Sequence, residues 1–145
     1  MLALVILIAS ILIFRGLGFA GVSAFASWPA AVRDGLAVML LFATSARFTP
    51  MKEDLIRMTP RWVPWPRAMV FFTGFCELAG AIGFVIPATR RAAGIALILF
   101  FIAVLPANIQ AAHSGITLRG RPPTPLWLRV PMQVLFIFLA WWSTQ

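Results

Sequence analysis

The chain has 145 residues, of which 61% are hydrophobic and 11% are charged. This composition is too apolar for a water-soluble domain of this size, so it indicates an integral membrane protein. The formal net charge is +8, but the cations are scattered at the ends of apolar runs, which excludes a nucleic-acid-binding surface as the reason for the charge.

The apolar runs predict five transmembrane helices in a single membrane domain that covers residues 1–145. The first of them carries Gly16, Gly18 and Gly21, small residues that predict a close-packing surface on its second half. We therefore expect an all-α fold, in which a four-helix transmembrane bundle is preceded by one additional transmembrane helix packed on its outside. The predicted spans are 2–22, 30–48, 66–86, 92–113 and 125–142.

The longest polar connection is 49–66, in which 51–58 has the pattern of a short amphipathic helix. The connection between the third and fourth spans is very short, so these two spans should form an antiparallel hairpin. Pro106 lies inside the fourth span, where it removes one backbone hydrogen bond and predicts a kink.

The basic residues predict the orientation in the membrane. Most of them fall on the face that holds the 49–66 connection, and this face is therefore expected to be cytoplasmic. The protein would then be a multi-pass protein of the cell inner membrane, with a cytoplasmic N-terminus and a C-terminus on the outside. The basic residues on the cytoplasmic face are Arg47, Lys52, Arg57, Arg61, Arg67, Arg119, Arg121 and Arg129, and those on the other face are Arg33, Arg90 and Arg91.

Glu77 lies midway between Pro66 and Pro87, so the third span places this carboxylate near the middle of the bilayer. An ionised side chain at that depth costs about 2.5–3.5 kcal/mol on insertion scales. Small residues share its helix face and bulky apolar residues share the opposite one, so Glu77 should face protein. Two interpretations stay open: a proton-handling or hydrogen-bonding carboxylate in a ligand cavity, or a structural carboxyl that holds helices in register. By depth, Arg15 and Arg129 are the expected partners.

A second set of polar side chains lies within about 10–15 Å of the cytoplasmic face, at a helical rise of about 1.5 Å per residue. Such a set can line a cavity for a lipophile with a polar head, and Glu77 and Thr73 would close the inner end of that cavity. The alternative is snorkelling of the two arginines, which we favour for them, together with hydrogen bonds between helices. For Asn108 we favour a ligand, because Pro106 frees the carbonyl of Ile102 nearby. The set consists of Arg47, Asn108, His113, Arg129 and Gln133.

His113 and Cys76 are the only histidine and the only cysteine. A single residue of each type provides neither a metal site, nor a pair of haem ligands, nor a disulfide. We therefore expect no covalent cofactor and no enzyme that acts alone.

Six short motifs, in this order, resemble those of the DoxX-like membrane proteins over about residues 30–142. They are Phe48-x-Pro50, Pro60-x-x-x-Pro64-x-Pro66, Thr73-Gly-x-x-Glu77, Pro87-x-x-Arg90-Arg91, Pro106-Ala-Asn108 and Pro125-Leu-Trp-Leu-Arg129. The chain departs from that family in having Arg47-Phe48 where His-Phe is frequent, and in its additional first helix. The resemblance implies a small redox-associated membrane protein, because some relatives are subunits of quinone-linked sulfur oxidation and others act in oxidoreductase maturation or as membrane chaperones.

Two classes of function follow from these patterns. The first is a redox-associated membrane subunit that binds a quinone, as a non-covalent cofactor, or another lipophilic molecule. The second is a non-enzymatic scaffold, chaperone or assembly factor for a partner membrane or redox protein. The expected partners are the lipid bilayer, a lipophilic small molecule, and either a partner protein or a second copy of the chain.

Overall fold

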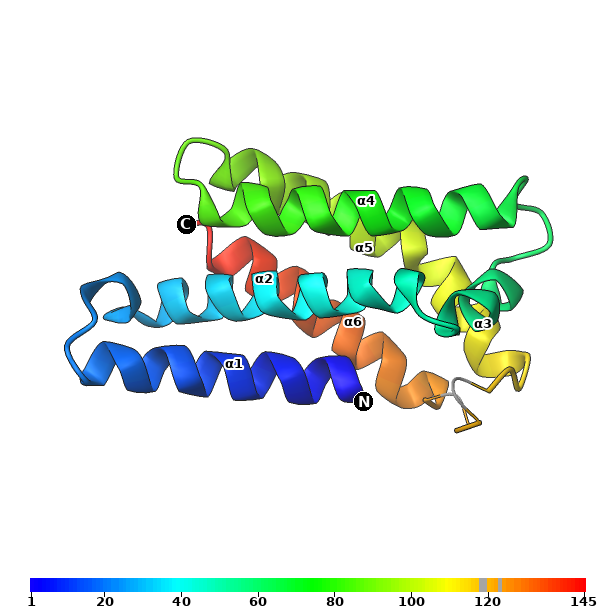
Figure 1. Cartoon of the computed structure of the whole chain (residues 1–145), viewed down its shortest axis with the longest axis horizontal. Helices are drawn as coiled ribbons and strands as arrows, with labels where there is room; N and C mark the ends of the chain where they lie inside the picture. The colour runs from blue at the N-terminus through cyan, green and yellow to red at the C-terminus, as the bar shows by residue number, and fades with distance from the viewer. Residues whose placement is uncertain (118–119, 123) are drawn as a thin grey trace.

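The computed structural model describes residues 1–117, 120–122 and 124–145, and its architecture is all-helical (Figure 1). Every predicted span coincides with a long helix, and the 51–58 segment forms the short helix expected there. The elements are α1 (Leu2–Phe19), η1 (Ser23–Phe25), α2 (Trp28–Ser45), η2 (Ala46–Phe48), α3 (Met51–Met58), α4 (Pro66–Val85), α5 (Arg90–His113) and α6 (Leu126–Trp142).

The helices form an antiparallel bundle in which α2 packs on α4, α4 on α5, and α5 on α6, while α6 also touches α2. In Figure 1, α1, α2 and α4 run nearly along one direction, and α5 and α6 pass behind them at an angle. α1 packs on α2, outside the other four helices, as expected. The short helix α3 lies at one end of the bundle, and the α4–α5 turn lies at the other end with the C-terminus.

Helices α1, α2, α4 and α5 are long and apolar enough to cross a membrane. α6 is an apolar helix of 17 residues, slightly shorter than these, and its crossing of the membrane stays a prediction. Large apolar side chains such as Phe72 and Phe75 are exposed along the outside of the bundle. An apolar exterior around a helical bundle is compatible with a multi-pass membrane protein.

The contact between α1 and α2 differs from the prediction. The buried residues of α1 are Leu7 and Ser10, and the glycine that meets α1 closely is Gly35 of α2. A Cβ atom at Gly35 would lie 2.7 Å from Cγ1 of Ile11. No described atom lies within 4 Å of a Cβ built at Gly16 or Gly21. The expected packing surface of Gly16, Gly18 and Gly21 is therefore wrong, because these residues belong to the end of the helix and the turn after it: Gly18 faces the backbone of Phe25, and Gly21 has a φ of 102°.

Candidate functional site

Glu77 is buried in the bundle, with 8% of its surface exposed, and it forms an ion pair with Arg47. Arg47 lies in η2, directly after α2, and its side chain extends back along α4. Its Nη1 lies 2.6 Å from Oε2 of Glu77, and its Nη2 lies 3.0 Å from Oε1. Two parallel contacts of this kind are the bidentate geometry in which arginine binds a carboxylate most strongly.

The remaining donors of Arg47 are also used. Its Nε donates to the carbonyl of Val70 at 3.2 Å, and Nη1 donates to the carbonyl of Ala43 at 2.6 Å. Nη2 lies 3.5 Å from the hydroxyl of Thr73, and the hydroxyl of Thr44 lies 3.3 Å from Oε2 of Glu77. The pair is thus neutral overall and satisfied, as a buried ion pair must be to persist.

Gly74 provides the space for the Arg47 side chain. A Cβ atom at this position would lie 2.6 Å from Cδ of Arg47 and 3.0 Å from its Nε. The small-residue face of α4 is buried as predicted, at Gly74, Gly80 and Ala81. The Thr73-Gly-x-x-Glu77 motif therefore has a local physical reason: the threonine accepts from the guanidinium, the glycine makes room for it, and the glutamate neutralises it.

The partner of Glu77 is not one of those predicted. Arg15 lies over the ring of Phe19, 3.8 Å from its centroid, and Arg129 contacts α5 instead. Side chains on a helix point toward its N-terminus. At the end of α2 this direction leads into the bundle, so Arg47 reaches the mid-depth carboxylate instead of snorkelling outward, and the expectation that it snorkels is wrong.

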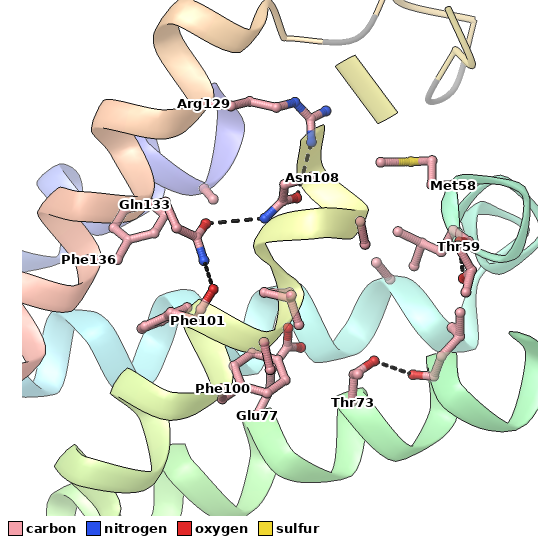
Figure 2. Close-up of a pocket in the computed structure, with 18 of the residues that line it drawn as sticks. Met58, Thr59, Thr73, Glu77, Phe100, Phe101, Asn108, Arg129, Gln133 and Phe136 are labelled. Carbon is pink, nitrogen blue, oxygen red and sulfur yellow. Dashed lines mark hydrogen bonds between the residues drawn. The ribbon is translucent and has the colours of Figure 1, made fainter. Parts of the chain in front are cut away.

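A chain of hydrogen bonds connects α6 with α5 on the other side of the interior (Figure 2). Nη1 of Arg129 donates to Oδ1 of Asn108 at 3.2 Å, and Nδ2 of Asn108 donates to Oε1 of Gln133 at 3.2 Å. Nε2 of Gln133 then donates to the carbonyl of Phe101 at 2.7 Å. This carbonyl lies in the turn before Pro106, next to the carbonyl of Ile102 that the proline leaves without its usual donor.

A cavity of about 460 Å³ separates the Glu77–Arg47 pair from this chain of hydrogen bonds. A volume of this size is within the range of small-molecule sites. Figure 2 shows Glu77, Asn108 and Gln133 around the space, with Met58 and Thr59 of the α3 segment at another side. All the candidate ligand-binding residues except His113 line it, and its apolar wall includes Met39, Leu40, Phe100, Phe101, Met132 and Phe136.

A family model described as "Domain of unknown function (DUF8561)" matches residues 36–144. The chain belongs to the DUF8561 family. No curated protein and no solved structure matches the chain. The DUF8561 match gives no link to the DoxX-like proteins, so that resemblance stays a prediction.

The DUF8561 region contains every polar residue of the cavity, and it begins within α2, so α1 lies outside it. The family region therefore corresponds to the four-helix part of the fold, in which the cavity lies. The helix that precedes it contributes to the cavity only through its first residues, Met1, Leu2 and Ala3.

His113 does not belong to the site of this DUF8561 member. Its ring is exposed, and Nδ1 lies 2.9 Å from the carbonyl of Ile109 on the same helix. At about 100° per residue, five residues from Asn108 turn the side chain about 140° away from the cavity. The prediction placed His113 at the correct end of the bundle but on the wrong side of its helix.

Thr44 is a site residue that the sequence analysis missed. It is buried, and it precedes Arg47 by three residues, a spacing that places both on one helix face. That spacing was the available signal. Arg119, one of the cations used for the predicted orientation, lies outside the described residues.

Proposed function

We propose that this protein is a multi-pass membrane protein that binds a quinone-like or other lipophilic molecule with a polar head group, and that it acts as an accessory subunit of a redox system. The observation that supports this most is the cavity, which has apolar walls and polar side chains at two sides. Helices packed only for stability would close such a space, because voids in a packed interior forfeit contacts.

The polar groups differ in what they can offer a ligand. The five N–H groups of the Arg47 guanidinium are taken up within the protein. An amide nitrogen carries two donors, and the side-chain nitrogens of Asn108 and Gln133 each use one of them in the described contacts. The carbonyl oxygens of a quinone require donors of this kind. The resemblance to quinone-linked relatives supports a quinone, whereas the cavity itself suits any lipophile with an acceptor at its head.

The second class of function, a scaffold or assembly factor, is favoured by one feature of the same site. The side chains of Asn108 and Gln133 are hydrogen-bonded to each other, and Gln133 also donates to the carbonyl of Phe101. These bonds join α5 to α6. A protein with only this role would hold no small molecule after purification. The two classes therefore differ in a measurable way.

Filling the cavity tests the proposal. Ala107 lines the cavity from α5, whereas Ala96 on the same helix is exposed on the outside of the bundle. We expect Ala107→Phe to lower the amount of lipophile released on organic extraction by about tenfold or more, equivalent to about 1.4 kcal/mol of lost affinity. Mass spectrometry of the extract measures this, with Ala96→Phe as a control that adds the same side chain and should match the unmodified protein. Equal release from all three proteins, or none from any, would favour the scaffold.

We also propose that the end of the bundle carrying α3 faces the cytoplasm in the inner membrane, because most basic residues flank it. In a Cys76→Ala background, Thr89→Cys and Thr117→Cys place single thiols at exposed positions near opposite ends of the bundle. A membrane-impermeant maleimide added outside should label position 89 and leave position 117 unlabelled until the membrane is opened. Labelling of both positions from one side would refute the topology, and the reverse pattern would refute the orientation.

A further inference from the structure

Arg129 is a partly buried guanidinium without a carboxylate partner in the described part of the chain. Its Nε donates to the carbonyl of Thr124 at 2.9 Å, and its Nη1 donates to Oδ1 of Asn108 at 3.2 Å. Both acceptors are neutral. The chain has four acidic residues, and each has a cation other than Arg129 beside it. The pairs are Arg33 with Asp34, Arg47 with Glu77, Arg57 with Asp54, and Arg67 with Glu53.

The cavity therefore has an excess of positive charge. Glu77 cancels Arg47, which leaves Arg129 as the uncompensated charged side chain that lines the space, and the amino group of Met1, which also lines it, lies 3.4 Å from Oγ1 of Thr124. Arg129 is also the fourth residue of α6, and no side chain caps the start of this helix. The N-terminal turn of a helix carries a partial positive charge of its own. Two independent sources thus make this side of the cavity electropositive.

Two hydrogen bonds to neutral acceptors hold the guanidinium in place and leave Nη2 without a partner among the described residues. Nη2 and the second N–H of Asn108 are donors from two different helices at the same side of the cavity. A guanidinium N–H and an amide N–H can each donate to an oxygen of a carboxylate or phosphate, and the bond from the charged guanidinium is the stronger of the two. A cation held partly out of water is stabilised by an anion that neutralises its charge, whereas a neutral carbonyl only accepts a hydrogen bond from it.

We propose, on the basis of the proposed function, that the lipophile has an anionic oxygen head group, either the carboxylate of a fatty acid or the phosphate of a phospholipid. The head group binds Arg129 and Asn108. The acyl chain lies against the apolar wall at Phe100, Phe101 and Phe136 and extends toward the neutral Glu77–Arg47 pair.

Electron paramagnetic resonance of lipid probes tests this in phosphatidylcholine vesicles that contain the whole protein. The probes are stearic acid spin-labelled near its chain end, its methyl ester, and a phosphatidylglycerol with the same labelled chain, at a pH at which the acid is ionised. The unmodified protein should immobilise the stearate about tenfold more strongly than the ester, as expected for a charge-assisted hydrogen bond. A larger immobilised fraction of stearate than of phosphatidylglycerol identifies a fatty acid as the source of the head group, and the reverse identifies a phospholipid.

Three variants separate the role of Arg129 from general surface charge and from folding. Arg129→Gln should lose most of the preference for the stearate over the ester, and Arg129→Lys should keep most of it. Arg91→Gln removes an exposed cation at the opposite end of the bundle and should behave as the unmodified protein. The proposal is overturned if the ester, or competing decylubiquinone, binds as tightly as the stearate, or if Arg91→Gln loses the preference as Arg129→Gln does. These outcomes leave the binding of a lipophile in the cavity intact. If none of the probes gives an immobilised signal, the proposed function itself is refuted.

Discussion

Replacing Glu77 by glutamine is expected to lower the free energy of unfolding by about 3–5 kcal/mol, because it leaves a buried guanidinium without its counter-ion. Glutamine has nearly the same size as glutamate, so the change removes the charge and leaves the packing. The effect should be large because Arg47 makes a bidentate contact with the carboxylate and lies in the same protein interior. Reversible unfolding in mixed detergent micelles, followed by circular dichroism, measures it.

Two further proteins make this prediction specific. The double variant Arg47→Met and Glu77→Leu removes both charges, and it should recover most of the lost stability, since an apolar pair can replace a buried ion pair. Glu53→Gln is the matched control, because its contact with Arg67 is exposed and should contribute at most about 1 kcal/mol. A Glu77→Gln protein as stable as the Glu53→Gln protein would mean that the carboxyl of Glu77 is uncharged in the fold.

Adding a single methyl group at Gly74 should destabilise the protein by about 1–3 kcal/mol, the usual cost of overpacking. The new Cβ would lie 2.6 Å from Cδ of Arg47. An arginine side chain normally moves away from such a contact, but this one is held by hydrogen bonds to α2 and α4. The Gly74→Ala protein must therefore either strain the ion pair or separate α2 from α4. Unfolding under the same conditions measures the loss.

Gly16→Ala is the control for this substitution, because no described atom lies within 4 Å of a Cβ at that position. Alanine in a helix interior is favoured over glycine by about 1 kcal/mol, so Gly16→Ala should be neutral or stabilising. In an Arg47→Met background, Gly74→Ala should lower the free energy of unfolding by a smaller amount, because methionine is not fixed by an ion pair. If Gly74→Ala lowers the free energy of unfolding equally in both backgrounds, the new Cβ clashes with a residue other than Arg47.

The fold was largely predictable because each span is a long apolar run bounded by prolines, glycines or charges. The third span illustrates this: residues 66–86 were expected, and α4 covers Pro66–Val85. The face of Glu77 was also predictable, since residues three and four positions away are small and lie together on a helix. Which helices touch was predictable only in part, because glycines mark a close approach without showing which partner uses them.

The residues of the site were easier to predict than their pairing. Depth along the bundle places the Cα atoms of Arg47 and Asn108 at one end, but it does not show where a long side chain leads. Arg47 reaches Glu77 because arginine is long and its helix directs it inward, whereas His113 faces outward because of its rotation on α5. The cavity could not be derived from spacing, since its volume depends on the packing of apolar side chains from five helices and the α3 segment.

The space between α2, α4, α5 and α6 is proposed to hold a lipophile. A crystallographic map of the protein, purified with its native lipids and grown in a lipidic mesophase, tests this most directly. We predict elongated density along Phe100 and Phe136, with its polar end within about 3 Å of Nη2 of Arg129 or Nδ2 of Asn108. A cavity that contains only water, or one closed by contact between α4 and α6, would contradict the account.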